Sequence, residues 1–148
     1  MFQGETAVTL DDKGRMAIPA SQREPVSKAS GNRLVITYNP FEQGCLWIFP
    51  QAEWERVRDD VNALSSLKGV HRNLQMKLVG AAAPVEPDGN GRIAIPASQR
   101  AATGIEKRAV LLGMGNKFEL WGEQAHTAKI RETIDEAQIS GDMAELKL

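Results

Sequence analysis

The chain has 148 residues, of which 42% are hydrophobic and 25% charged, and its formal net charge is −1. This composition is typical of a soluble globular protein, and the length fits one ordinary domain or two small ones. The sequence lacks a run of about 18 apolar residues that could span a bilayer, its start MFQGETAV does not resemble a secretion signal, and its one cysteine cannot form an internal disulfide. We therefore expect a cytoplasmic protein that has no membrane partner.

The distribution of charge is more informative than its sum. Residues 11–33 and 88–108 each carry a net charge of +2 (five basic and three acidic residues, then four and two), whereas residues 117–148 carry −3 (four basic and seven acidic). The near-neutral total gives no support for a nucleic-acid partner, because such domains are usually basic. The acidic C-terminal end nevertheless offsets, in the net charge, two mildly basic segments.

The first predicted element is a β-hairpin. Residues 5–10 alternate in polarity like a strand, Asp11 to Gly14 supplies turn residues, and Arg15 to Ile18 follows as the returning strand. Pro19 suits the first position of a helix. Pro25 should cut that helix short.

Two apolar strands are predicted next, at Leu34 to Tyr38 and Leu46 to Phe49. A stripe of apolar residues at helical spacing then indicates an amphipathic helix; it comprises Trp54, Val57, Val61, Leu64 and Leu67. One more helix is expected over residues 70–79, before a hinge at residues 80–83 between the two halves.

The second half follows the same order. Asp88-Gly89-Asn90-Gly91 is a stronger turn, because its glycines can adopt positive φ, and Arg92 to Ile95 is its returning strand. Pro96 precedes an expected helix at residues 97–103. Further strands are predicted at Val110 to Gly113 and Phe118 to Trp121, followed by a less regular helical stripe of Ala125, Ile130, Ile134 and Ala137.

The two halves share an internal repeat. GRMAIPASQR at residues 14–23 returns as GRIAIPASQR at residues 91–100, with Met16 replaced by Ile93. Over residues 11–23 and 88–100, ten of thirteen positions are identical. Such self-similarity indicates one supersecondary unit used twice.

These residues resemble the MraZ family of bacterial regulators, which is associated with division and cell-wall genes. The resemblance covers nearly the whole chain and lies in the twice-used pattern Asp-x-x-Gly-Arg-x-x-Ile-Pro, in Gly44-Cys45-Leu46 with Pro50 and Glu53-Trp54, and in Gly80-Ala81-Ala82. It implies a mainly β fold with short helices (α+β), in which two tandem AbrB-like β-barrel-type repeats form an intrachain pseudo-dimer. It also implies a ring of copies that binds promoter DNA.

We place the first repeat, with its trailing helices, at residues 1–79 and the second, with its C-terminal helix and tail, at residues 80–148. Three positions depart from the family pattern. His126 stands where a tryptophan corresponding to Trp54 is expected, and Gln22 and Gln99 stand where relatives are often apolar. These changes concern local helix packing and leave the Asp and Arg signature intact.

The signature positions of the family map onto Asp11 and Arg15 and onto Asp88 and Arg92. An arginine offers a planar fork of donors that matches guanine O6 and N7 or phosphate oxygens, so we assign Arg15 and Arg92 to DNA binding. The aspartate four residues earlier lies across the turn and could orient the guanidinium through a bidentate pair. In an isolated hairpin such a pair would more often only close the turn. Its repetition and the resemblance favour the functional interpretation.

Other polar residues near the turns are less specific. Lys13 and Asn90 occupy the same place in the two turns and are assigned to DNA binding through phosphate or bases, with a solvated turn residue as the equal alternative. Arg23 and Arg100 lie past the prolines, where an internal salt bridge or a packing role is the better interpretation.

No catalytic residues, cofactor or metal site are predicted. Cys45 heads an apolar strand and is expected to be buried, His71 and His126 lack partners at metal-ligand spacing, and Gly89-Asn90-Gly91 lacks the lysine and hydroxyl of a phosphate-binding loop.

The sequence therefore predicts a sequence-specific DNA-binding transcriptional regulator, not an enzyme, that is associated with the nucleoid. It should act at promoter direct repeats, including those of its own division and cell-wall gene cluster. The predicted partners are double-stranded promoter DNA and further copies of the chain, with no small-molecule substrate. Two alternatives remain: an antitoxin-like or adaptor module that captures a protein through residues 138–148, and a ring-forming structural scaffold, which the near-neutral charge favours.

Overall fold

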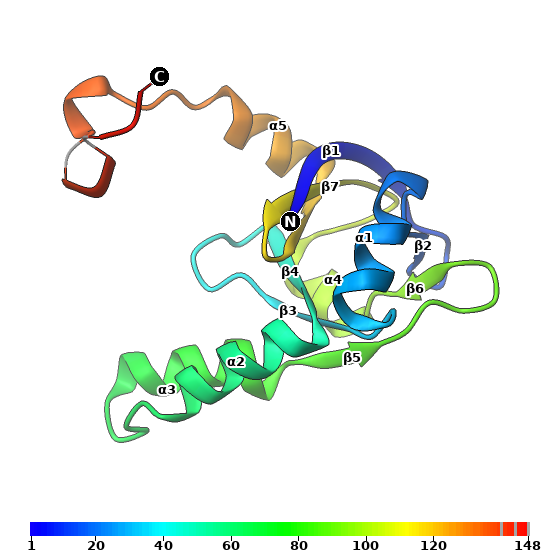
Figure 1. Cartoon of the computed structure of the whole chain (residues 1–148), viewed down its shortest axis with the longest axis horizontal. Helices are drawn as coiled ribbons and strands as arrows, with labels where there is room; N and C mark the ends of the chain where they lie inside the picture. The colour runs from blue at the N-terminus through cyan, green and yellow to red at the C-terminus, as the bar shows by residue number, and fades with distance from the viewer. Residues whose placement is uncertain (140, 144, 148) are drawn as a thin grey trace.

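The computed structural model describes residues 1–139, 141–143 and 145–147, and its main feature is a six-stranded antiparallel sheet (Figure 1). In spatial order its strands are β1 (Phe2–Thr9), β7 (Arg108–Gly115), β8 (Phe118–Gly122), β4 (Cys45–Pro50), β3 (Leu34–Tyr38) and β5 (Ala83–Val85). A separate two-stranded sheet pairs β2 (Arg15–Ala17) with β6 (Arg92–Ala94). Both sheets combine strands from the two repeats.

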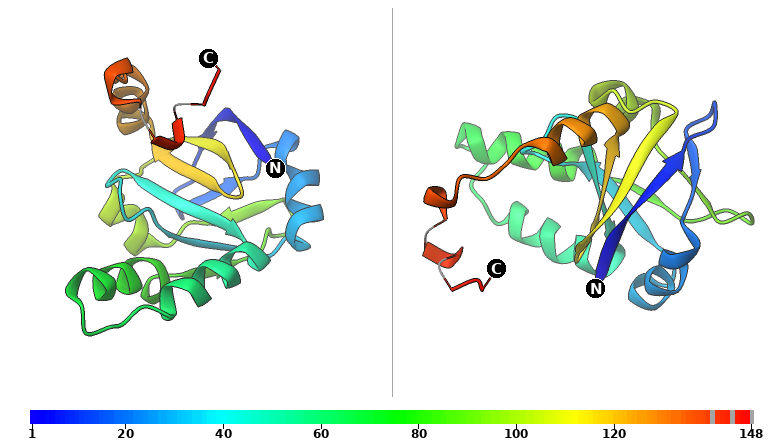
Figure 2. Two further views of the ribbon diagram at one scale, coloured as in Figure 1. Left: turned by 60° about the vertical axis from the view of Figure 1, so that its left-hand side comes forward. Right: turned by 90° about the horizontal axis from the view of Figure 1, so that it is seen from above.

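Short helices connect the strands or follow the last one. They are α1 (Ala20–Ser30), α2 (Gln51–Asn62), α3 (Gly69–Gln75) with the π-helical turn η1 (Met76–Gly80), α4 (Ala97–Thr103), α5 (Glu123–Arg131), and the 3₁₀ turns η2 (Glu136–Gln138) and η3 (Gly141–Met143). Figure 2 shows α2 and α3 lying along each other at one side of the sheet. The predicted mainly β fold with short helices is confirmed. Among the described helices, none is long and apolar enough to cross a membrane.

The predicted turns are present, but the prediction that their flanking strands pair with each other as hairpins is wrong. β1 does not pair with β2; it runs antiparallel to β7 over its whole length, from Phe2 opposite Gly115 to Thr9 opposite Arg108. In the second repeat β5 likewise pairs with β3 and not with β6. An isolated two-stranded hairpin is marginal in water. Exchange of partners places every strand in a sheet that spans both repeats.

The main core lies between the large sheet and the β2–β6 pair. Met16 and Ile93 are direct cross-strand partners there and are 1% and 2% exposed. The only difference between the two decapeptides thus falls where the copies contact each other. A second, smaller cluster under the α2–α3 hairpin comprises Val35, Phe49, Trp54, Val61 and Leu78.

Helix α1 does not end at Pro25, contrary to the prediction. The proline removes one backbone donor, and its partner would have been the carbonyl of Ser21, which is exposed and can accept a hydrogen bond from water. Beyond the proline, Val26 is 1% exposed in the core, and Gly31 ends the helix at a φ of 58°. Pro19 and Pro96 are the N-cap residues of α1 and α4, and the helix predicted at residues 97–103 is present with those bounds.

Both amphipathic helices are shorter than their stripes suggested. α2 ends at Asn62, so that Leu67 is 95% exposed. α5 ends at Arg131; His126 in its first turn is buried, whereas Ile130 in its last turn and Ile134 beyond its end are exposed. The helix predicted at residues 70–79 is present as α3 and η1. The hinge expected at residues 80–83 is shorter than predicted, because the strand β5 begins at Ala83.

Gly113 allows β1 and β7 to pair closely, and its replacement tests this packing. A Cβ at residue 113 would lie 2.6 Å from Gln3 Cα, so Gly113→Ala should lower the free energy of unfolding by roughly 1–3 kcal/mol. Gly69→Ala is the matched control, because its Cβ would meet nothing within 4 Å at the start of α3. Denaturant titration that found the two variants equally stable would contradict the described pairing.

Candidate nucleic-acid interface

The pairing of β2 with β6 places the two Asp-x-x-Gly-Arg turns side by side. Arg15 lies opposite Ala94, and Ala17 lies opposite Arg92. Beyond these strands, the N–H of Ile18 donates to the Gly91 carbonyl at 3.0 Å, and the N–H of Ile95 donates to the Gly14 carbonyl at 2.8 Å. Each turn is therefore bonded to the chain that follows the other turn. Both turns project from the same end of the molecule (Figures 1 and 2).

In the first turn, Asp11 organises both the backbone and the arginine. Its Oδ1 accepts hydrogen bonds from the backbone N–H groups of Lys13 and Arg15, each at 2.9 Å. Its Oδ2 accepts from Arg15 Nε at 2.8 Å. Gly14 closes the turn with a φ of 78° that favours glycine. The carboxylate thus satisfies the turn and fixes the base of the guanidinium.

The second turn repeats this arrangement with a looser ion pair. Asp88 Oδ1 accepts from the backbone of Asn90 at 2.8 Å and of Arg92 at 3.0 Å, while Arg92 Nε lies 3.4 Å from Asp88 Oδ2. Arg92 Nη1 also lies 3.5 Å from Asp11 Oδ2 of the first turn. The two aspartates and the two arginines therefore form one network across the repeats.

The bidentate ion pair expected between each aspartate and its arginine is not formed. One oxygen of each aspartate is used by backbone N–H groups, so the carboxylate meets Nε and does not clamp both ends of the guanidinium. For Arg15, the η nitrogens make no hydrogen bond to any residue that the structure describes. Arg15 is about one third exposed. These donors are available to a ligand beside the turns.

The carboxylates of the network are held ionised by hydrogen bonds. The backbone N–H of Arg15 is the largest of the contacts that lower the pKa of Asp11, and the backbone N–H of Arg92 does the same for the pKa of Asp88. Lys13 and Asn90 are exposed at the turn tips. Lys13 adds a positive charge at the tip of the first turn.

Arg23, which is exposed, and Arg100, which is half-buried, lie against the chain beside the turns, which agrees with the packing role predicted for them. Their Nε atoms donate to the carbonyls of Ile18 and Ile95, at 3.2 and 3.1 Å. Each guanidinium reaches the glycine of the opposite repeat: a Cβ on Gly14 would lie 2.6 Å from Arg100 Cζ, and one on Gly91 would lie 3.6 Å from Arg23 Nη2. It was not predicted that each arginine would contact the turn of the other repeat, because a sequence repeat does not reveal which copy contacts which turn.

The glutamines that depart from the family pattern bind backbone groups. Gln22 Nε2 donates to the Gln3 carbonyl at 3.0 Å, and Gln99 Nε2 donates to the carbonyls of Ile36 and Ala81 at 3.1 and 2.9 Å. They attach α1 and α4 to the sheet. His126 is 8% exposed, and its Nε2 lies 3.1 Å from Glu5 Oε1.

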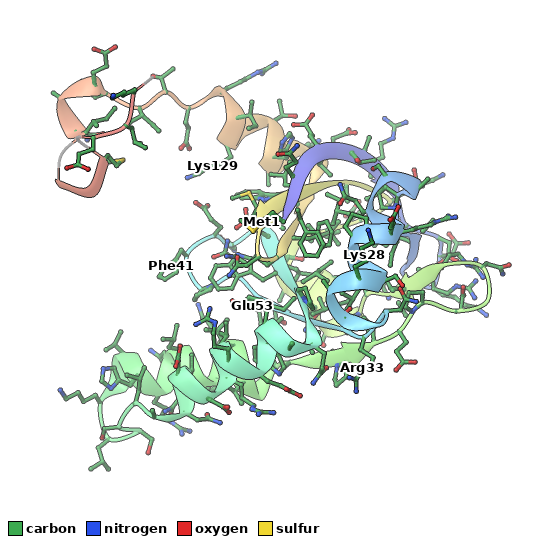
Figure 3. The ribbon with its side chains drawn as sticks, in the orientation of Figure 1. Met1, Lys28, Arg33, Phe41, Glu53 and Lys129 are labelled. Atoms are coloured by element: carbon green, nitrogen blue, oxygen red, sulfur yellow. The ribbon has the colours of Figure 1, made fainter. Side chains whose placement is uncertain are left out.

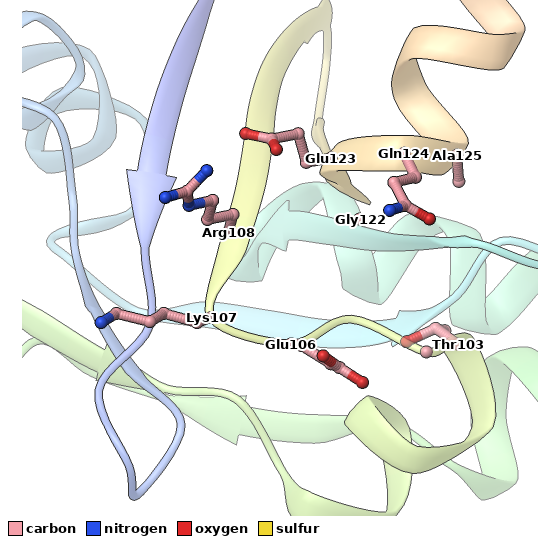
Figure 4. A pocket seen from close by; sticks show the side chains of 9 residues that line it. Thr103, Glu106, Lys107, Arg108, Gly122, Glu123, Gln124 and Ala125 are labelled. Atoms are coloured by element: carbon pink, nitrogen blue, oxygen red, sulfur yellow. The ribbon is translucent and has the colours of Figure 1, made fainter.

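Other candidate sites have less to support them. Cys45 is buried as predicted, and burial raises the pKa of its thiol. Within the described ranges, no group of three His, Cys, Asp or Glu side chains could hold a metal ion. A pocket of about 560 Å³ between α4, β7 and α5 brings Lys107 and Arg108 near Glu106 and Glu123 (Figure 4), and these opposite charges cancel.

The turn network can be set beside known proteins. The family model described as "MraZ protein, putative antitoxin-like" matches residues 1–77 and again 78–147. Proteins named "Transcriptional regulator MraZ" from Stenotrophomonas maltophilia, Xanthomonas oryzae pv. oryzae and Xylella fastidiosa are 62%, 60% and 55% identical to this chain. Each of these matches covers 100% of both proteins.

A structural match is weak by comparison. The solution structure of PHS018 from Pyrococcus horikoshii has a TM-score of 0.34 and 14% sequence identity, over 82% of this chain and 89% of that chain, and supports no inference. The assignment to a family rests on the family model matching twice and on the sequence identity to the named relatives over their full length. On that evidence, and with the repeated Asp-x-x-Gly-Arg turns paired at its surface, the chain belongs to the MraZ family.

Proposed function

We propose that the chain is a sequence-specific DNA-binding regulator of transcription, associated with the nucleoid, that reads DNA with the paired turns of β2 and β6. The observation that carries this proposal is the juxtaposition of the two Gly-Arg turns at one projecting end. The names of the full-length relatives, which are transcriptional regulators and not enzymes, support it.

Arg15 and Arg92 are the proposed readers. Arginine donors match guanine O6 and N7 in the major groove, and the η nitrogens of Arg15 are available for such a contact. Lys13 and Asn90 stand at the turn tips, where they would meet phosphate or base edges. Asp11 and Asp88 would orient the arginines without contacting DNA.

Several copies should act together. One chain offers few basic groups, so a single copy gains little from counterion release, whereas adjacent copies on one duplex add their contacts through effective concentration. We propose a homo-oligomeric ring in which residues 1–79 and 80–148 are two versions of one unit. Neighbouring copies in a ring are related by rotation and would present their turns in the same direction along the duplex.

The arginines can be tested directly. Arg15→Ala and Arg92→Ala should each weaken binding to DNA from upstream of the chain's own gene by about 1–3 kcal/mol per lost base contact, since each removes a bidentate donor. Arg58→Ala, on α2, is the control and should bind like the wild type. Mobility shift with competitor DNA measures the affinities, and wild-type affinity in the double variant would refute the assignment of the readers.

The aspartates predict how binding responds to acid. Because the folded chain lowers the pKa of Asp11 and Asp88, the stability that they add is fully present above about pH 3.9, the ordinary value for Asp. It is lost as the pH falls through the lower folded values. We therefore expect turn geometry and DNA affinity to be unaffected by these groups from pH 8 to 5. Carboxyl NMR resonances of Asp11 or Asp88 that titrated above 3.9 would contradict the hydrogen-bonded turn.

The ring predicts the form of the operator. Copies that follow one another in the same orientation should protect direct repeats with centres about 10 bp apart, one helical turn. Arginine readers favour a guanine-rich box in each repeat. A footprint over the chain's own promoter measures both properties. A palindromic footprint would be the signature of a two-fold dimer and would exclude the proposed arrangement.

A further inference from the structure

Large apolar side chains that remain exposed gather in two segments outside the sheets. In the described part of the chain, seven of the ten such residues lie there: Leu67, Val70 and Met76 in the α2–α3 hairpin, and Ile130, Ile134, Met143 and Leu146 in α5 and the tail. Singly exposed apolar residues are normal, but clusters mark surfaces that another molecule covers.

The exposed side of residues 68–77, which are the N-cap of α3, α3 itself and the start of η1 and are called the α3 face below, is basic as well as apolar. Residues 61–85 contain three Lys or Arg and no Asp or Glu. Lys68 and Arg72 lie one helical turn apart on the solvent side, with Met76 on the following turn and Lys77 beside it. The opposite side, which includes Leu78, packs into the smaller core.

This face is held firmly against the body of the protein. Thr37 Oγ1, from β3, lies 2.8 Å from the carbonyl oxygens of both Lys77 and Leu78, and its single proton is shared between them. Gln75 Nε2 donates to the carbonyls of Val61 and Leu64, at 3.3 and 3.0 Å, and so joins α3 to α2. The charged and apolar side chains are therefore presented on a fixed surface.

The tail has the opposite charge. Residues 132–148 carry five acidic residues and one lysine, a net charge of −4 (one minus five), against +3 for residues 61–85. Glu132, Glu136 and Glu145 are exposed, and of these Glu132 also lies 3.3 Å from Lys129 Nζ of its own α5. The tail therefore combines acidic side chains with uncovered apolar ones, as α3 combines basic side chains with uncovered apolar ones.

The hairpin and the tail occupy equivalent places in the two repeats. α2 starts directly after β4, and α5 starts directly after β8, so α3 and the tail each follow the corresponding helix. Both lie away from the DNA-reading turns: Figure 1 has α3 and the C-terminus on the left and the turns on the right. In Figure 3 the side chains of α3 extend outward from the body. Contact between two α3 faces, or between two tails, would join like charges and be unfavourable.

We propose that the tail of one copy, residues 132–147, lies across the exposed side of α3 of a second copy. Complementary charges and two uncovered apolar surfaces support this occupant. The contact joins different surfaces of the two copies, so it is heterologous and continues from copy to copy. This inference rests on the oligomer of the proposed function and names the surfaces that build it, while the turns remain free for DNA.

Charge exchange tests the contact. The first variant carries Lys68→Glu, Arg72→Glu and Lys77→Glu, and the second carries Glu132→Lys, Glu136→Lys and Glu145→Lys. Each alone should self-associate at least ~10-fold more weakly than the wild type, because like charges then face each other. An equimolar mixture should recover assembly, since each altered surface meets its complement on the other variant. A chain with all six changes should assemble by itself.

Sedimentation velocity at micromolar protein measures assembly, and thermal unfolding confirms that each variant is folded. Either threefold variant assembling like the wild type would overturn the proposal. A mixture of the two that stays dissociated, while the chain with all six changes assembles, would also overturn it, because that result indicates a tail bound to α3 of its own chain. A wild-type monomer would also overturn it. A wild-type oligomer that fails to shift promoter DNA would instead reject the proposed function and leave this interface standing.

Discussion

The antiparallel pairing of β2 with β6 is the constraint on which the rest of the structure depends. These strands are three residues each and come from different repeats. The ladder is extended by Ile18 and Ile95, whose N–H groups bond to the glycine carbonyls of the opposite turns. Because each repeat completes the other, neither turn can be placed by its own half of the chain. Met16 and Ile93 are buried at the centre of the contact between the two strands.

The aspartates bear on how a near-neutral chain could present the proposed recognition surface. Each carboxylate cancels one arginine in the net charge, yet it uses one oxygen on the turn backbone and the other on Nε. In the proposed function the arginine is thereby oriented before DNA arrives, which would reduce the entropy that binding costs. Arg92 lies within reach of both carboxylates, so the two turns are also coupled to each other. For that function the local orientation of donors would matter more than the total charge.

The pseudo-symmetry is kept at one end of the molecule and lost at the other. The turns, the prolines and the supporting arginines Arg23 and Arg100 correspond closely in the two repeats. At the far end, α2 leads into the basic α3 hairpin, whereas α5 leads into an acidic tail. Equivalent turns need equivalent residues because each turn supports the other. The proposed contact between unlike surfaces requires the two repeats to differ, and the difference lies at the end away from the turns.

The sequence by itself determined the repeat, the fold class, the approximate positions of every strand except β5, and the identity of the turn residues. Asp, Gly and Arg at fixed spacing make the same local turn in both copies, because its hydrogen bonds lie within five consecutive residues. The extent of α1, α2 and α5 was predicted less well, because burial of Val26 and His126 and the exposure of Leu67 depend on neighbours far along the chain. Only the tertiary structure decided that the hairpins exchange partners, that Arg23 and Arg100 support the opposite turns, and that both turns project together. The physical reason is that a strand's alternation fixes which side chains face the core and leaves open which strand it pairs with; that choice follows from the apolar surface that the two repeats bury together.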